Sequence, residues 1–192
     1  MEETTVRQAD VRDWAALRGV RLRALGEDPD AFCSTWDREA AFTEDQWRER
    51  AGKGAWFLAW PGGLPDEPSV ASSGTPSEAA SPTTSHGAAD AAPEAPDGVA
   101  SGILRPGTGG CELLGLWVDP ASRGSGLAVE IVTAVAGWAR RTRAGRLDLW
   151  VMDGNSRARA FYRRQGFLET GEAQVSPGRP GDVEIGMTLP LI

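Results

Sequence analysis

The 192-residue sequence is poor in the side chains that build disulfide frameworks, thiolate metal sites and histidine-dependent catalysis. Its two cysteines, Cys33 and Cys111, are too few for a disulfide scaffold or a zinc ligand set. Both lie among apolar residues, so we expect them to be buried, and we expect no metal centre. His86 is the only histidine, which argues against a Ser-His-Asp hydrolase.

Long hydrophobic runs and an excess of positive charge are also missing. No run of about eighteen apolar residues could span a bilayer, and the charged N-terminus MEETTVRQAD does not resemble a secretory signal. We therefore expect a cytoplasmic protein with no membrane partner. The net charge of −7 disfavours nucleic acid as a partner. We interpret the one basic cluster as a solvated helix end, consisting of Arg140, Arg141, Arg143 and Arg146.

Large apolar residues are scarce between residues 62 and 98, where Pro, Ser, Ala and Gly dominate. Ordering this segment would cost backbone entropy with little burial to offset the loss, so we predict a disordered insertion. Loop-closure entropy grows only logarithmically with length, so the flanking strands can still pair. We therefore predict one domain, residues 4–190, interrupted by this insertion. A partner-binding role for the insertion is the alternative, although its low complexity argues against it.

The most informative stretch runs from Glu112 to Ala128. Residues 113–118 are short and almost wholly apolar, which indicates a strand buried on both faces. A glycine-rich turn follows, and then a helical pattern begins at Leu127. Backbone N–H groups at such a helix N-terminus point toward one spot, so the turn could bind an anion such as a pyrophosphate. An ordinary strand-to-helix connection would give the same local pattern.

Two ordered motifs add specificity to this interpretation. Residues 123–128, RGSGLA, match the pattern [Q/R]-x-x-G-x-[G/A] directly after the apolar strand. Further on, Asn155, Ala158, Tyr162 and the pair Gly166-Phe167 match N-x-x-A-x-x-x-Y-x-x-x-G-F. Together these motifs resemble those of the GNAT superfamily of acyl-CoA-dependent N-acyltransferases.

The resemblance implies an α/β fold: a GNAT-like single domain with a mixed, mostly antiparallel sheet, a splayed parallel strand pair and flanking helices. The hydrophobic patterns agree with it, because they predict strands at 4–7, 56–60, 99–104, 113–118, 147–152, 167–170 and 183–189. The parallel pair would be the strands 113–118 and 147–152. Acyl-CoA would enter the cleft where these two strands separate.

The resemblance also implies which residues bind acetyl-CoA, the expected acyl donor. Backbone groups of Leu116 and Val118 would pair with the pantetheine arm, while the Trp117 side chain between them packs into the core. Asn155 would bond the pantetheine or adenosine portion. The pyrophosphate would lie on the backbone of the glycine turn, formed by Arg123, Gly124, Ser125, Gly126, Leu127 and Ala128.

Acyl transfer from a thioester to an amine requires a base for the ammonium and an acid for the departing thiolate. Tyr162, the only tyrosine, has a hydroxyl that could act as the acid; a structural hydrogen bond is the alternative role. Strand alternation places Glu112 on the same face as Val118, so Glu112 could be the base, or simply an exposed carboxylate at the strand start. Glu39 and Asp153 could instead recognise a cationic substrate.

We therefore expect an N-acetyltransferase that moves acetyl from acetyl-CoA to a primary amine through a ternary complex. A non-catalytic acyl-CoA-binding or regulatory module is the alternative. The acceptor stays open among protein N-termini, lysines, polyamines, amino acids and aminoglycosides, and a small molecule or a peptide would both fit. The sequence does not fix the oligomeric state, for which a homodimer is one option.

Overall fold

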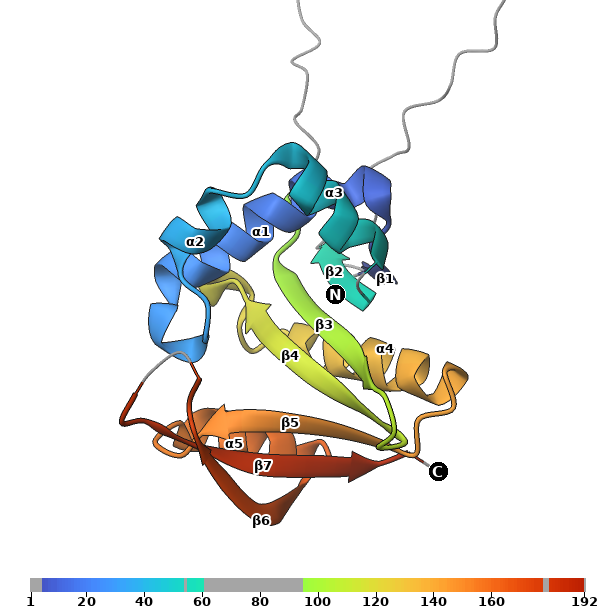
Figure 1. Ribbon diagram of the computed structural model, residues 1–192, viewed down its shortest axis with the longest axis vertical. Helices are drawn as coiled ribbons and strands as arrows, with labels where there is room; N and C mark the ends of the chain where they lie inside the picture. The colour runs from blue at the N-terminus through green and yellow to red at the C-terminus, as the bar shows by residue number, and fades with distance from the viewer. Residues whose placement is uncertain (1–4, 54, 61–94, 178–179, 192) are drawn as a thin grey trace, which may run out of the picture.

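The computed structural model describes residues 5–53, 55–60, 95–177 and 180–191. Seven strands form one mixed sheet in the order β1-β2-β3-β4-β5-β7-β6, in which β4 and β5 are the parallel pair (Figure 1). This architecture confirms the predicted fold class. The strands are β1 Thr5–Gln8, β2 Ala55–Trp60, β3 Gly98–Arg105, β4 Gly110–Val118, β5 Arg146–Met152, β6 Leu168–Val175 and β7 Val183–Pro190.

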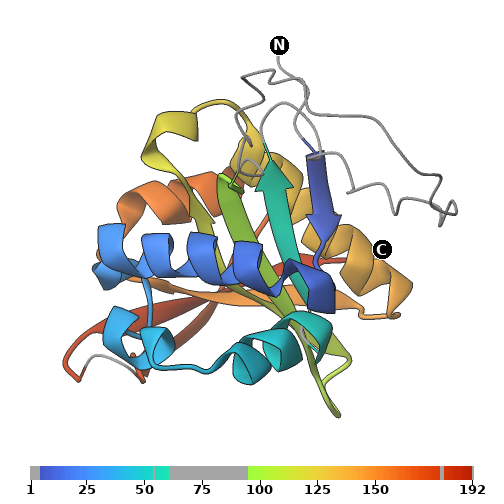
Figure 2. The same cartoon turned by 90° about the horizontal axis from the view of Figure 1, so that it is seen from above.

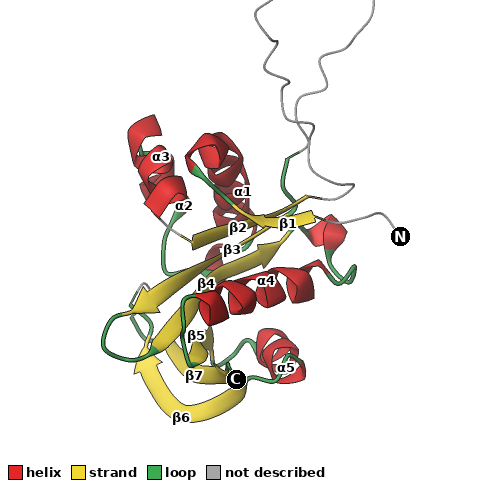
Figure 3. Cartoon of the chain, turned by 90° about the vertical axis from the view of Figure 1, so that its right-hand side faces the viewer, coloured by secondary structure: helices red, strands yellow, loops and turns green. Residues whose placement is uncertain are grey.

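Helices cover both faces of the sheet. On one face of strands β1 to β4 lie α1, α2 and α3, and on the other lies α4, with α5 beside β5 and β7 (Figures 2 and 3). The apolar core is accordingly divided in two, with Leu17 of α1 on one side of the sheet and Ile131 of α4 on the other. The helices are α1 Trp14–Glu27, α2 Trp36–Ala40, α3 Glu44–Lys53, α4 Leu127–Arg141 and α5 Ser156–Arg164, with single 3-10 turns η1 Val11–Asp13, η2 Pro29–Ala31 and η3 Pro120–Ser122.

The parallel strands β4 and β5 separate soon after they meet. Their pairing covers only three positions, from Gly110 opposite Arg146 to Glu112 opposite Asp148. Beyond Glu112 the two strands diverge, so that β5, β6 and β7 swing away from β1 to β4 (Figure 1). The predicted splayed pair is therefore present, and the β5-facing edge of β4 is left without a neighbouring strand after Glu112.

A β-bulge in β4 overturns the predicted strand alternation. Opposite β3, the step from Ser101 to Val99 is matched by the longer step from Leu114 to Trp117, and Gly115 between them has φ +62°. Leu113 and Val118 consequently face the same core beside α4, although strict alternation would separate them. The prediction that Glu112 and Val118 share a face is therefore wrong, because the extra residue at the bulge reverses the alternation.

Several other expectations need correction or lie outside the described residues. Cys111 is fully buried as predicted, but Cys33 is exposed. The helix α2 was not predicted, since five residues are too short to show a helical period. Most of the predicted insertion, residues 62–94, lies outside the described residues, whereas Gly98 at its end belongs to β3 and pairs with Ala59. Among the described helices, none has the length and hydrophobicity needed to cross a membrane.

Candidate active site

Two cavities meet at the place where β4 and β5 separate. The first, here the cleft cavity, has a volume of about 640 Å³ and lies between the diverging strands, the segment after α1 and strand β7. The second, here the loop cavity, has a volume of about 630 Å³ and lies between the glycine turn, β4 and α5. Both volumes are typical of small-molecule sites. The residues that line both cavities are Ala31, Leu116, Asn155, Ala158 and Tyr162.

The glycine turn has the geometry of an anion site. Gly124 and Gly126 have φ of +89° and +98°, and a Cβ on either would meet no atom within 4 Å, so the backbone is open to a ligand. Gly126 is also the N-cap of α4, a helix of fifteen residues. Within the described residues, the N–H groups of Gly124, Gly126 and Ala128 donate to no acceptor. These groups and the helix dipole favour an anion at this point.

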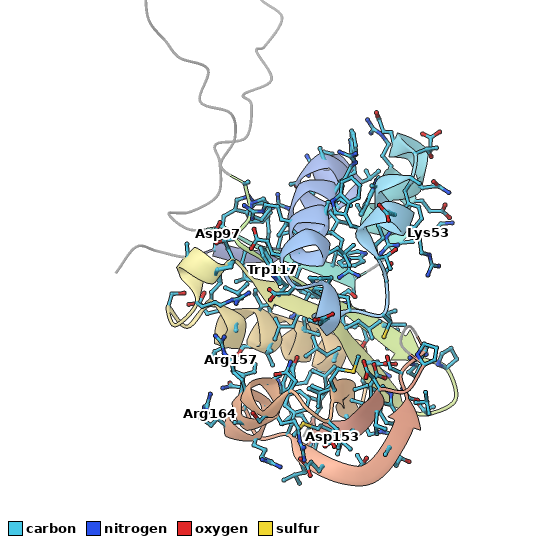
Figure 4. All side chains as sticks on the ribbon, turned by 90° about the vertical axis from the view of Figure 1, so that its left-hand side faces the viewer. Lys53, Asp97, Trp117, Asp153, Arg157 and Arg164 are labelled. Carbon is cyan, nitrogen blue, oxygen red and sulfur yellow. The ribbon has the colours of Figure 1, made fainter. Side chains whose placement is uncertain are left out.

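Arg123 does not supply a free charge to this turn. Its Nη2 donates to Asp28 Oδ2 at 2.5 Å, and its Nε donates to the carbonyl oxygen of Val118 at 3.1 Å. The guanidinium therefore connects the turn to the end of α1. It also uses the carbonyl oxygen of Val118, a backbone group that we expected to bind the donor. Asp28 Oδ2 also accepts from the Trp117 indole at 2.8 Å, so Trp117 packs beneath α1 as predicted (Figure 4).

Two arginines that sequence reasoning missed line the loop cavity instead. Arg157 and Arg164 are exposed on α5, at the edge of the molecule that also carries the glycine turn (Figure 4). Neither forms an ion pair within the described residues, so both charges are available to phosphate groups. The only signal in the sequence was their position in the Asn155–Phe167 motif, on a helix whose spatial neighbours are distant in the chain.

Asn155 ends the strand-to-helix connection after β5 and caps α5. Its Oδ1 accepts the backbone N–H of Ala158 at 3.0 Å, which satisfies one of the donors at the helix start. This bond orients the side chain so that the amide NH₂ is left to donate to a ligand. Because Asn155 lines both cavities, that donor lies where the two cavities join.

Tyr162 is held in place by aromatic neighbours. Its ring makes edge-to-face contacts with Phe161 and Phe167, with centroid distances of 5.3 and 5.4 Å. Burial raises the pKa of the phenol well above its ordinary value, since the phenolate would lose its hydration. Within the described residues its hydroxyl has no hydrogen-bond partner. The structure therefore gives no support to a purely structural hydrogen bond for Tyr162.

Glu112 lies at the last position of β4 that pairs with β5, where the cleft cavity begins. Its side chain is buried rather than exposed, with 5% of its surface accessible, and it forms an ion pair with Arg105 of β3. The ion pair holds the carboxylate at the mouth of the cleft cavity, which Glu112 and Arg105 both line. Arg105 is half exposed and was not identified from the sequence.

The two carboxylates expected to recognise a cationic substrate are both already paired. Glu39 is 1% exposed and accepts from Arg21 Nε at 3.1 Å and Nη2 at 3.0 Å, with Arg50 at 3.6 Å. Burial alone would raise the pKa of Glu39, but the hydrogen bonds and charge of Arg21 outweigh it and hold the pKa below its usual value. Asp153 is exposed and binds Arg159 at 2.7 Å. Neither carboxylate therefore has a charge left for a ligand.

Comparison with known proteins agrees with this geometry. Residues 77–167 match the family model described as Acetyltransferase (GNAT) family. A GNAT-family acetyltransferase from Streptococcus pneumoniae has the same fold, with a TM-score of 0.69, 15% identity, and coverage of 99% of this chain and 100% of the other. The Salmonella typhimurium protein yncA, solved with its cofactor acetyl-CoA, has a TM-score of 0.66 at 18% identity, with coverage of 99% and 95%.

The ribosomal-protein-S18-alanine N-acetyltransferase from Escherichia coli is similar in fold as well, with a TM-score of 0.58, 17% identity and coverage of 98% and 94%. No curated protein sequence matches the chain. The fold, the glycine turn and the paired cavities define the class of acyl-transferring enzymes. Within that class, residues 77–167 match the model of the GNAT acetyltransferase family, and the fold is that of the GNAT acetyltransferases compared above.

Proposed function

We propose that this protein transfers the acetyl group of acetyl-CoA to a primary amine directly, within a ternary complex. The observation that carries the proposal is the junction of the two cavities at Tyr162. The loop cavity is lined by anion-binding groups and suits the donor, and the cleft cavity opens from the other side and suits the acceptor. Donor and acceptor would then meet without a covalent enzyme intermediate.

The donor's binding groups follow from the geometry of the loop cavity. The backbone from Arg123 to Ala128 would hold the pyrophosphate, with Arg157 and Arg164 adding positive charge. The unpaired edge of β4 from Leu116 to Val118 would bond the pantetheine arm in the manner of an added strand. The Asn155 amide would donate to the arm at the junction. When bound, the donor supplies the activated acetyl thioester.

The chain's own residues would then move two protons. Glu112, which is paired with Arg105, would accept the ammonium proton, directly or through a water molecule. Tyr162 would protonate the departing sulfur, and its raised pKa ensures that the proton is present over the physiological range. Desolvation of the phenol favours this neutral form.

The first test is calorimetric titration with acetyl-CoA, followed by turnover with a panel of primary amines. Arg164→Ala should weaken acetyl-CoA binding about fivefold, an effect of ~1 kcal/mol. Arg163→Ala, its neighbour outside the loop cavity, serves as the control. Tyr162→Phe should bind acetyl-CoA normally but lower kcat by roughly 10²-fold, the usual scale of acid–base catalysis.

The outcomes separate the proposal from its alternative. If Tyr162→Phe combined with Glu112→Gln left kcat unchanged, the assignment of both proton-transfer roles would be wrong. If the wild type bound acetyl-CoA but acetylated no amine, a regulatory acyl-CoA-binding module would explain the fold better.

A further inference from the structure

A third carboxylate of the cleft cavity, Glu184 on β7, has only neutral hydrogen-bond partners among the residues that the structure describes. Its side chain is 6% exposed and lines the cavity. Oε1 accepts from Ser176 Oγ at 3.1 Å and from Cys33 Sγ at 3.4 Å, and Oε2 accepts from Gln174 Nε2 at 2.9 Å. These donors come from the segment after α1, from β6 and from the turn after β6, so three separate parts of the fold hold the carboxylate in one orientation.

The charge of Glu184 is not balanced as the others are. Glu39 and Glu112, the other carboxylates that line the cavity, each have an arginine partner. Within the described residues, no arginine or lysine lies within 4 Å of Glu184. Neutral donors satisfy hydrogen bonds but leave the net charge, and a buried charge without a counter-charge is costly. A carboxylate offers about four acceptor positions, so one remains beside the three in use.

The register of the sheet places Glu184 away from Glu112, the expected base. Glu184 pairs with Met152, whereas Thr188 of the same strand pairs with Asp148, the residue opposite Glu112 where β4 and β5 separate. Four residues of strand correspond to roughly 13 Å. Glu184 also lies outside the set of residues shared by the two cavities, which includes Tyr162. A group bound at Glu184 is therefore separate from the ammonium group that Glu112 would deprotonate.

We propose that Glu184 binds a second cationic group of the acceptor, so that the substrate class is an extended molecule with a reacting primary amine and a distal ammonium or guanidinium. This inference rests on the proposed function, because it takes the cleft cavity as the acceptor site. The cation would supply a counter-charge that no described arginine or lysine gives Glu184 within 4 Å, and it would take the remaining acceptor position. Glu184 is thus a specificity-determining residue, distinct from the groups that transfer protons.

The experiment compares a linear alkyl monoamine with the α,ω-diamine of the same carbon chain, over a series of chain lengths. The wild type should favour the diamine in kcat/KM. Glu184→Gln should raise KM for the diamine by about 10- to 100-fold, which corresponds to loss of a hydrogen bond to a charged group. Kinetics with the monoamine and the affinity for acetyl-CoA should stay unchanged. Glu172→Gln, an exposed glutamate on β6, is the matched control.

Further variants and readouts keep the outcomes distinct. Gln174→Leu removes a neutral donor but keeps the charge, so it should raise the diamine KM less than Glu184→Gln does. An equal fall in kcat for monoamine and diamine in Glu184→Gln would overturn the proposal, since the residue would then act on the reacting amine. No preference of the wild type for diamines would overturn it as well.

Failure of the proposed function has a different signature. In that case no amine is acetylated. Calorimetric titration of the diamine into the acetyl-CoA complex then tests binding at the cleft cavity without any turnover. Binding that Glu184→Gln weakens supports the cation subsite, and binding that it leaves unchanged, or no binding to the wild type, refutes it.

Discussion

Tyr162 shows how the surroundings of a single side chain change the pKa of its hydroxyl. Its ring packs edge-to-face against Phe161 and Phe167, and burial raises the pKa of its hydroxyl above the ordinary value of 10.0. The folded protein therefore holds the phenolic proton more tightly than the unfolded chain does. This contribution to stability is complete below about pH 10 and is lost as the pH rises above it.

Because Tyr162 is the only tyrosine in the sequence, the raised pKa of its hydroxyl can be tested by absorbance. We expect no tyrosinate absorbance from the folded protein near pH 10, and its appearance at higher pH together with unfolding as followed by circular dichroism. The free energy of unfolding of Tyr162→Phe should fall less steeply above about pH 10, because the variant has no phenol to ionise. A reversible titration near pH 10 in folded protein would show that the hydroxyl is hydrated.

The sequence predicted the identity of several site residues but not their electrostatic environment. Tyr162 and Asn155 follow from a motif whose spacing is local. The ion pair of Arg123 with Asp28 joins residues about 95 positions apart in the chain. The hydrogen bond from Cys33 to Glu184 joins residues about 150 positions apart. A hydrophobic pattern carries no information on such pairs, which is also why Cys33 was expected to be buried.

Among the elements, β4 shows how one glycine redirects a strand. Gly115 has φ +62°, and a Cβ there would lie 3.1 Å from Arg21 Nη1. The bulge lets Leu113 and Val118 both face α4 while Trp117 turns toward α1. The edge of β4 that faces the loop cavity is thereby set, and the buried Arg21–Glu39 pair packs against the bulge.

We expect Gly115→Ala to lower both stability and acetyl-CoA affinity. The left-handed conformation costs a non-glycine residue about 1–2 kcal/mol, and the methyl group would press on Arg21. Gly107→Ala is the control, with φ +77° in the turn between β3 and β4 and no atom within 4 Å. Urea unfolding should show a loss in both variants, and calorimetry should show weaker acetyl-CoA binding only in Gly115→Ala. Equal effects on binding would mean that the bulge does not set the donor site.

Most elements could be predicted because their hydrophobic patterns are long and regular. Helix α4 repeats Leu127, Ile131 and Val135 on one buried face, and β5 alternates buried and partly exposed residues. Helix α2 and the β4 bulge were missed for a common reason. Each depends on one or two residues whose conformation is fixed by packing, through Glu39 in α2 and Gly115 in β4.

For the molecule as a whole, the position of the long segment between β2 and β3 is informative. The two strands pair as an antiparallel hairpin, and Asp97 N–H donates to the Ala59 carbonyl at 2.8 Å, so the ends of the segment are held together by the sheet. Closing a long connection costs little more than closing a short one. The fold can therefore carry this segment without relying on it.

Replacing residues 62–94 by a short Gly-Ser turn should leave acetyl-CoA affinity unchanged. The free energy of unfolding should stay the same or rise by up to about 2 kcal/mol, because the unfolded chain loses loop entropy. Urea unfolding and calorimetry would measure the two quantities. A loss of affinity would show that the segment contributes to the donor site.

The carboxylate of Asp28 has a consequence for the order of events in catalysis. It accepts hydrogen bonds from the Trp117 indole and the Arg123 guanidinium, so these bonds connect the end of α1 to the glycine turn. The chain that continues from Asp28 forms part of the wall of the cleft cavity through Phe32. We therefore expect a donor bound at the glycine turn to stabilise the proposed acceptor wall as well. Such a shared segment favours an ordered kinetic scheme, in which acetyl-CoA binds first and free CoA leaves last.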